Sequence, residues 1–184
     1  MTNKMTAIAP SRVHEKLVPD DSGETGSSAD DWRLRGLQER PGFLIRRLHQ
    51  IHVALFTEEC ASENITPVQY SVLTALEQMG PSEQVALSRA VGLDRTNIAD
   101  VIARLERRKF VKRRVAPKDR RTKIAALTEA GRRLLAQVEA GAARAHERTI
   151  EALPADQRER FVDQMRQLVR ANNELSRSPI SRIK

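Results

Sequence analysis

The chain has one cysteine, few aromatic residues and no long apolar run. The lone Cys60 cannot form an intrachain disulfide, which is typical of proteins from a reducing compartment. No apolar stretch approaches the roughly 20 residues needed to span a bilayer, and the N-terminus lacks the apolar core of a signal peptide. We therefore expect a cytoplasmic protein without a membrane partner.

Several kinds of functional motif are also missing. The sequence has no phosphate-binding glycine loop, no nucleophile motif and no metal cluster of recognised spacing, so we expect neither an enzyme nor a bound cofactor or metal. One Trp, one Tyr and four Phe supply few surfaces on which the bases of a single strand could stack. If the partner is a nucleic acid, duplex DNA is favoured.

The positive charge is concentrated in one segment. The whole chain has a formal net charge of +8, whereas residues 89–123 alone hold 13 basic and 4 acidic residues, a net charge of +9. Such a cluster attracts polyanions and gains free energy when phosphate counterions are released. Nucleic acid is the leading partner, and a solvated basic surface is the alternative.

Apolar spacing and composition divide the chain into consecutive segments. Residues 1–30 lack apolar periodicity, so we expect a disordered arm. An apolar stripe predicts a helix from Pro41 to about Ser62, within an N-terminal dimerisation segment over 31–65. A DNA-binding domain is expected over 66–127, two C-terminal dimerisation helices over 128–176, and a tail over 177–184.

Capping residues mark the first helix of the middle segment. Thr66 and Gln69 have capping-box spacing, and Pro67 suits a first helical position, so a helix is expected from Pro67 to about Gly80. The residues expected to face inward on it are Val68, Val72, Ala75 and Leu76. In the last two helices, the inward residues are expected to include Leu134, Leu135, Val138, Ala142, Phe161, Met165 and Leu168.

Two further helices follow with a tight turn between them. Ser82 is expected to cap a short helix that Gly92 closes, and Asp94 to cap a helix that reaches about Lys109. This is helix-turn-helix spacing. On the second helix the buried stripe leaves a polar, basic face outside. We expect Arg95, Thr96 and Asn97 to read bases in the major groove, and Ser88, Arg89 and Arg104 to contact phosphates.

Alternating residues on either side of segment 116–122 predict a β-hairpin with a basic tip. Lys118, Arg120 and Arg121 are expected to enter an adjacent minor groove, and Asp119 to pair with Arg121 and stabilise the tip. The fold expected is mainly α with a small β-hairpin wing, a winged helix-turn-helix with helical dimerisation arms. An ordinary charged helix and a solubilising loop are the alternative reading.

Four motifs together carry a family resemblance. They are Gly92-Leu93-Asp94-Arg95-Thr96, Leu105-Glu106-Arg107-Arg108, Lys118-Asp119-Arg120-Arg121 and Leu127-Thr128-Glu129-Ala130-Gly131. From about residue 40 to 175 the chain resembles MarR-type regulators, although Ala116 stands where that family usually has an acid. The resemblance implies a homodimer with interleaved terminal helices, a wing based on Asp119 and Arg121, and repression of a double-stranded operator that a ligand relieves.

The first helix contains the candidate effector residues. Arg46, Arg47, His49 and His52 place cationic or titratable groups among apolar residues, a mixture that suits a small aromatic carboxylate. Segment 41–52 resembles MarR-type regulators of aromatic acid catabolism, nicotinate-degradation repressors included. This resemblance implies a hydroxylated pyridine carboxylate such as 6-hydroxynicotinate, with phenolic acids and their thioesters as near alternatives.

Other interpretations of these residues stay open. His49 and His52 are as consistent with partly buried, hydrogen-bonded histidines at a dimer interface as with ligand binding. A metal site completed by Cys60 or His146 is the third interpretation, which no compact ligand cluster in the sequence supports. Nearby glutamates should raise the pKa of Cys60, which opposes a redox role and favours packing. The charge cluster alone would also fit an architectural protein that coats DNA without sequence preference.

Overall fold

The computed structural model describes residues 34–116 and 119–181, without the side chains of 116–122. The chain divides into two units, Met1–Arg40 and Pro41–Lys184. The described part of the first unit holds a short 3-10 helix, η2 (Leu37–Glu39), beside which Arg40 Nε donates to the Arg35 carbonyl at 3.3 Å. The arm expected over 1–30 lies outside the described residues.

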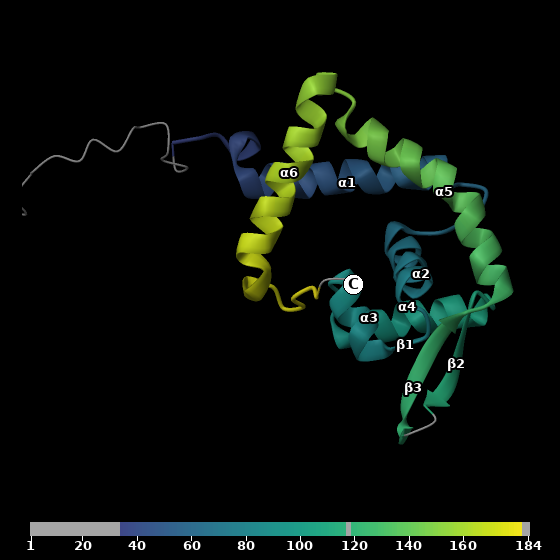
Figure 1. The fold of residues 1–184 in the computed structure, drawn as a ribbon. Helices are drawn as coiled ribbons and strands as arrows, with labels where there is room; N and C mark the ends of the chain where they lie inside the picture. The colour runs from purple at the N-terminus through teal and green to yellow at the C-terminus, as the bar shows by residue number, and fades with distance from the viewer. Residues whose placement is uncertain (1–33, 117–118, 182–184) are drawn as a thin grey trace, which may run out of the picture. The chain divides into compact units, whose positions relative to one another are not determined.

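The second unit is mostly helical, with a small antiparallel sheet of strand order β1-β3-β2. Figure 1 shows strands β2 and β3 as a hairpin that extends away from the helices. The elements in chain order are α1 (Pro41–Glu59), α2 (Pro67–Met79), β1 (Ser82–Glu83), α3 (Gln84–Val91), α4 (Arg95–Arg107), β2 (Val111–Ala116), β3 (Asp119–Leu127), α5 (Glu129–Ile150), α6 (Ala155–Asn172) and the 3-10 helix η3 (Asn173–Leu175).

The predicted capping box at the start of α2 is confirmed. Thr66 Oγ1 accepts from the Gln69 amide, and Gln69 Oε1 accepts from the Thr66 amide, both at 3.2 Å. The inward face of α2 was predicted with two errors: Val68, which was expected inward, is 39% exposed, and Leu73, which was not expected there, is fully buried. Leu73 lies between Val72 and Ala75 in the stripe, so the buried face is wider than the pattern suggested.

Ser82 does not cap α3, contrary to the expectation. It lies in β1, pairs with Ala125 of β3, and donates its hydroxyl to the Gly80 carbonyl at 3.0 Å. The N-cap of α3 is Glu83, whose side chain makes no capping bond. Recruitment of Ser82 as a third strand satisfies the open edge of the hairpin, which is a long-range contact that local spacing does not reveal.

The core joins α1, α2, α3, α4 and α5. Its largest fully buried side chains include Phe56, Leu73, Leu87, Ile98 and Leu105. On α5, Leu134, Val138 and Ala142 are buried as expected, and Leu135 is partly buried.

At the surface between α1 and α5, Arg144 Nε and Arg148 Nη1 each lie 2.7 Å from a carboxylate oxygen of Glu59. The basic groups lower the pKa of Glu59, mainly through their hydrogen bonds.

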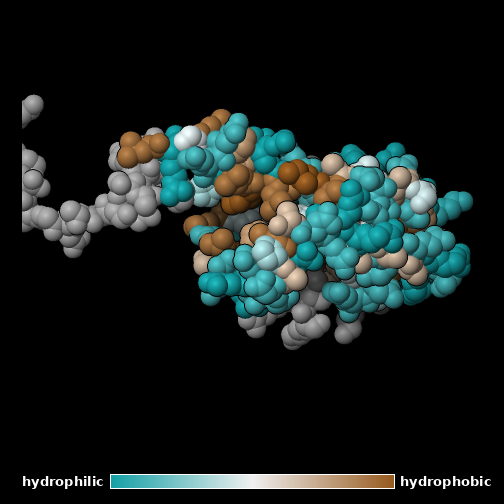
Figure 2. Space-filling view, turned by 90° about the horizontal axis from the view of Figure 1, so that it is seen from above, coloured by the Kyte–Doolittle hydropathy of each residue, from teal (hydrophilic) through white to brown (hydrophobic). Residues whose placement is uncertain are grey.

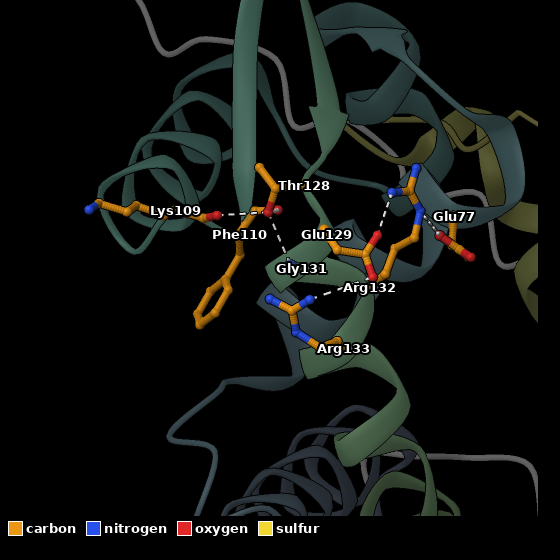
Figure 3. Close-up of polar contacts among 8 residues, drawn as sticks. All are labelled: Glu77, Lys109, Phe110, Thr128, Glu129, Gly131, Arg132 and Arg133. Carbon is orange, nitrogen blue, oxygen red and sulfur yellow. Dashed lines mark hydrogen bonds and ion pairs between the residues drawn. The ribbon is translucent and has the colours of Figure 1, made fainter.

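A compact junction attaches α5 to the base of the hairpin (Figure 3). Thr128 Oγ1 accepts from the Gly131 amide at 3.0 Å and lies within donating distance of the Lys109 and Phe110 carbonyls, at 2.7 and 3.1 Å. Glycine is required at position 131 because a Cβ there would overlap the Phe110 carbonyl. The start of α5 is therefore fixed to the turn that follows α4.

Helix α6 has no fully buried residue. Of the inward positions expected on it, Phe161 is partly buried, whereas Met165 and Leu168 are exposed within the protomer. Leu168 is 62% exposed, and Ile45 of α1 is 66% exposed. Hydrophobic residues gather on part of the face seen in Figure 2. After α6 the chain returns to α3, where the Ser181 amide donates to the Arg89 carbonyl at 2.9 Å (Figure 1).

Candidate nucleic-acid interface

The helix-turn-helix predicted from Gly92 and Asp94 is present. Gly92 ends α3 in the left-handed region, at φ 68° and ψ 31°, a conformation that glycine adopts without a Cβ penalty. Asp94 caps α4, and its Oδ1 accepts from the Asn97 amide at 2.8 Å. Ile98, Ile102 and Leu105 are buried under α4, so the opposite face of this helix is presented outward.

The three proposed base-reading residues all lie in the exposed first turn of α4. Asn97 Nδ2 donates to Asp94 Oδ2 at 2.7 Å, and the Arg95 carbonyl accepts from Gln84 Nε2 at 3.2 Å. The bond to Asp94 orients the Asn97 amide but uses only one of its two N–H groups, so its oxygen and second N–H stay available. An adenine edge requires one acceptor and one donor of this kind.

Ser88 occupies a different place from the one expected. It is buried, and its hydroxyl donates to the Leu93 carbonyl at 2.5 Å, inside the turn between α3 and α4. Because the single hydroxyl hydrogen is used there, Ser88 stabilises the turn and does not reach a phosphate as a donor. Arg89, by contrast, is exposed in the last turn of α3.

Basic residues continue along the C-terminal half of α4. Arg104 and Arg107 are exposed and line a surface groove of about 370 Å³ beside Thr66 at the start of α2. Arg108 instead holds the loop before α2, where its guanidinium donates to the Asn64 and Glu63 carbonyls at 2.6 and 2.9 Å. The cationic face of α4 thus runs well beyond its first turn, while Arg108 has a structural role.

The wing is described only in part. Strand β2 pairs with β3 from Val111 opposite Leu127 to Ala116 opposite Asp119, with an irregularity after Val115. Lys118 and the side chains of Asp119, Arg120 and Arg121 lie outside the described residues, and the expected pairing of Asp119 with Arg121 lies there too. Lys112, Arg114 and Lys123 are exposed on the described part of the hairpin.

One ion pair that the sequence reasoning missed joins the wing to α4. Arg113 on β2 binds the Glu106 carboxylate through its guanidinium, with Nε at 2.7 Å from Oε2, and its amide donates to Oε1 at 3.2 Å. These hydrogen bonds lower the pKa of Glu106. Glu106 is the only acid between Asp100 and Asp119, a signal that could have identified it.

The candidate effector residues of α1 separate into two groups. Arg46, His49 and His52 follow at intervals of three, which puts them on one side of the helix, whereas Arg47 lies away from that side. Arg46 stands over the Phe43 ring at 5.1 Å, and Arg47 Nη1 donates to Gln50 at 2.8 Å. Arg46, Arg47 and His49 are exposed, and His52 is partly buried.

His52 points toward α5. Its Nδ1 lies 2.9 Å from Thr149 Oγ1, and its ring stacks on His146 at 5.1 Å. Thr149 donates its only hydroxyl hydrogen to the Ala145 carbonyl at 2.6 Å, so His52 Nδ1 must be the donor and Nε2 of the neutral ring is an acceptor. Burial, then His146 and His49, lowers the pKa of His52, which favours this neutral ring.

Cys60 packs in the core, as its acidic surroundings suggested. It is 1% exposed, and burial, with Glu63 and Glu59, raises the pKa of its thiol. Across the described ranges, no group of three His, Cys, Asp or Glu residues has the geometry to hold a metal ion. No helix in the same ranges is long and apolar enough to cross a membrane.

Comparison with known proteins identifies the fold. The MarR family model matches residues 65–123, from the loop before α2 into β3. The HTH-type transcriptional repressor NicR of Pseudomonas putida is 37% identical over 97 residues, which are 53% of this chain and 61% of NicR. A structure of BpsR from Bordetella bronchiseptica also matches, and it concerns the regulation of DNA binding by 6-hydroxynicotinic acid. The identity is 30% and the TM-score 0.69, over 73% of this chain and 96% of the BpsR chain. The chain belongs to the MarR family.

A further matching structure has a bound ligand. The PcaV regulator of Streptomyces coelicolor, solved with its natural ligand, is 34% identical with a TM-score of 0.68 over 74% of this chain and 96% of that chain. The MarR-family chain is accordingly a transcriptional regulator of the NicR and BpsR type with a winged-helix fold. NicR is named as a transcriptional repressor and PcaV as a transcriptional regulator, and the BpsR structure is described by its DNA binding.

Proposed function

We propose that this MarR-family chain represses genes of aromatic catabolism, nicotinate degradation included, by binding a palindromic operator as a homodimer until a small aromatic carboxylate releases it. The observation that carries the DNA-binding role is the first turn of α4, where Arg95, Thr96 and Asn97 are exposed next to a capped helix start. The similarity to NicR and BpsR supports the choice of regulated pathway and effector.

The DNA-binding residues expected from the sequence receive roles in the proposed complex, with the exception of Ser88. Arg95, Thr96 and Asn97 read base edges, while Arg89 and Arg104 contact phosphates and fix the register. Lys118, Arg120 and Arg121 of the wing contact the adjacent minor groove, and Asp119 stabilises the wing through Arg121. The DNA-binding domain over 66–127 holds all of these residues. Ser88 is left out because its hydroxyl is committed to Leu93.

The segments on either side supply the proposed homodimer, from 31–65 and from 128–176. Exposed apolar side chains on α1 and α6, such as Ile45 and Leu168, would be covered by the second copy. Two copies would place two α4 helices on half-sites about one helical turn apart, roughly 34 to 36 Å.

The effector is proposed to bind on α1. Arg46 supplies a cation for the carboxylate, and His52 Nε2 supplies an acceptor for a ring hydroxyl, because Nδ1 already donates to Thr149. His49 lies between them on the same side of α1, and Arg47 completes the cationic surroundings. A hydroxylated pyridine carboxylate such as 6-hydroxynicotinate carries both complementary groups.

The proposal is tested by fluorescence anisotropy of purified protein on duplex DNA from upstream of its own gene. A regulator should prefer this duplex to random DNA by about 10³ or more, and 6-hydroxynicotinate or one of a panel of phenolic acids should release it. Arg46→Gln should keep DNA affinity and lose most of the response, whereas Arg47→Gln, which removes the same charge, should lose less. Weak binding indifferent to sequence and compound would replace the proposal with an architectural role.

A further inference from the structure

After α6 the chain continues as a short segment that lies against the helix-turn-helix. The side chain of Asn173, in η3, holds both backbone groups of one residue in this segment. Its Oδ1 accepts from the Ile180 amide at 2.9 Å, and its Nδ2 donates to the Ile180 carbonyl at 3.2 Å. The next residue, Ser181, donates its amide to the Arg89 carbonyl of α3 at 2.9 Å. Residues 173–181, which we call the C-terminal strap, thus connect the end of α6 to α3 (Figure 1).

The C-terminal strap also lies close to the turn between α3 and α4. A Cβ added to Gly92 would be 3.1 Å from Ile180 Cγ2 and 3.9 Å from the Ser178 carbonyl oxygen. The Ile180 side chain borders a cleft whose lining includes Ala90 and Val91 at the end of α3. The strap therefore contacts the helix-turn-helix at the point where the chain leaves α3 and turns into α4.

Few other contacts connect this end of the chain to the DNA-binding domain. Helix α6 has no fully buried residue. Within the described part of the chain, the bond from Ser181 to Arg89 is the only hydrogen bond or ion pair between residues 151–181 and residues 66–127. The first turn of α4 stays exposed beside the strap, so the strap is compatible with DNA binding and does not block it.

We propose that the C-terminal strap positions the helix-turn-helix for operator recognition, with Asn173 and Ile180 as its positioning residues. The inference rests on the proposed homodimer, in which α6 forms part of the interface and each α4 reads one half-site. A dimer gains affinity from its second half-site only when its two α4 helices are held at the matching separation. Because the strap fastens α3 to the end of a dimerisation helix, it restricts the movement of each DNA-binding domain relative to the dimer interface.

Hydrogen–deuterium exchange of the full chain without DNA tests whether the strap restrains α3 in solution. Asn173→Ala removes both side-chain bonds to Ile180, and Ile180→Ala removes the side-chain contact near Gly92. Each variant should increase amide exchange over residues 84–94 by about fivefold or more, because the strap no longer opposes local opening of α3 and the turn.

Two control variants make the same chemical changes outside these contacts. Asn172→Ala removes a side-chain amide that donates to the Leu168 carbonyl within α6 at 2.8 Å, and Leu175→Ala shortens a side chain that is 83% exposed. Both should exchange like the wild type over residues 84–94. Equal exchange in Asn173→Ala and Asn172→Ala would show that the strap does not hold α3 and would overturn the proposal.

Fluorescence anisotropy on three duplexes tests the positioning role itself. They are the full operator, a half-operator, and a full operator with one base pair inserted between the half-sites, which moves them apart by about 3.4 Å. Asn173→Ala should bind the full operator about fivefold or more weakly than the wild type, the lower end of couplings between sites. It should bind the half-operator equally, because its α4 surface is unchanged. On the inserted operator it should lose less affinity than the wild type, because its domains adjust more freely.

The outcomes separate this inference from the repressor proposal. An Asn173→Ala protein that matches Asn172→Ala on all three duplexes, or that loses equal affinity for full and half operators, would overturn the positioning role alone. A wild-type protein without preference for the operator over random duplex would refute the repressor and the positioning role together. The exchange measurement needs no DNA, so it distinguishes a failed strap from a failed repressor.

Discussion

Asp94 has two functions at the start of α4, and they act on the same neighbour. One carboxylate oxygen accepts from the Asn97 backbone amide and the other from the Asn97 side-chain amide. The first contact caps the helix, and the second restricts the side-chain rotamer of Asn97 before DNA arrives. In the proposed DNA complex, binding would then order fewer side-chain rotations, and less conformational entropy would be lost.

Asn97→Ala should remove base discrimination while keeping the helix cap, since the backbone amide at position 97 still donates to Asp94. We expect preference at one operator base pair to fall by about 1 to 3 kcal/mol, with binding to random duplex unchanged. Anisotropy titrations on operators with single base-pair changes measure this. Arg89→Ala is the comparison variant, because loss of a phosphate contact should weaken binding to all sequences alike. A uniform loss in Asn97→Ala would refute its base-reading role.

His52 should make folding stability depend on pH. Burial lowers its pKa, with smaller effects of His146 and His49, so the unfolded chain takes up the proton more readily than the folded chain. Stability should therefore fall as pH drops through the ordinary histidine range near about 6.5, and level off below the lowered folded pKa.

His52→Asn removes this titration while its amide can still donate to Thr149. Urea unfolding between about pH 8 and pH 5 should show a flatter dependence in the variant than in the wild type. An unchanged slope in His52→Asn would mean that the imidazole is not held in its neutral form.

The features of the helices that the sequence predicted well depend on contacts between residues three or four positions apart. The caps at Thr66 and Asp94 are confirmed, because a side-chain oxygen and the amide it satisfies both lie within one turn. The prediction that Ser82 caps α3 was wrong because its strand partner Ala125 is distant in sequence. The phosphate contact expected of Ser88 could not be judged from spacing. Spacing places Ser88 on α3, but only the geometry of the turn shows that its hydroxyl donates to the Leu93 carbonyl.

The candidate site shows the same division. The outer face of α4 follows from helical periodicity, so the exposed positions of Arg95, Thr96 and Asn97 could be predicted from spacing alone. The contacts of Arg113 with Glu106 and of His52 with Thr149 join separate elements, and no local pattern specifies them. The C-terminal segment was expected as a plain tail, yet Asn173 and Arg89 hold it through backbone bonds that depend little on its side chains.

The element-scale prediction concerns the junction in Figure 3. Thr128→Ala should lower the free energy of unfolding by about 1 kcal/mol, the usual effect of losing an N-cap, and by up to about 2 kcal/mol here because the contact with the Lys109 carbonyl is lost as well. Thr128→Ser keeps the oxygen and should stay near the wild type. Urea unfolding measures both, and equal midpoints for Ala and Ser would show that Thr128 is not the cap of α5 in solution.

Positive charge and exposed apolar side chains are concentrated in different segments of the molecule. Residues 89–123 have a net charge of +9 against +8 for the entire chain, so the flanking helices are close to neutral. These same helices expose the apolar side chains of α1 and α6. A charged surface attracts DNA, and an apolar surface favours a second copy, so the two features support the proposed separation of DNA binding and dimerisation into different segments.

Leu168→Glu should separate the proposed dimer. Leu168 is 62% exposed in the protomer, so the protomer should keep its fold, whereas burial of an unpaired carboxylate at the interface should raise the dimer dissociation constant by about 100-fold or more. Arg170→Gln changes the net charge by the same amount on the opposite side of α6 and should stay dimeric. Sedimentation velocity measures the assembly, and anisotropy on full and half operators should show the monomer bound only weakly to either. A Leu168→Glu protein that sediments like Arg170→Gln would place the interface away from this face of α6, and its operator affinity would then have to be explained without the apolar surface of that helix.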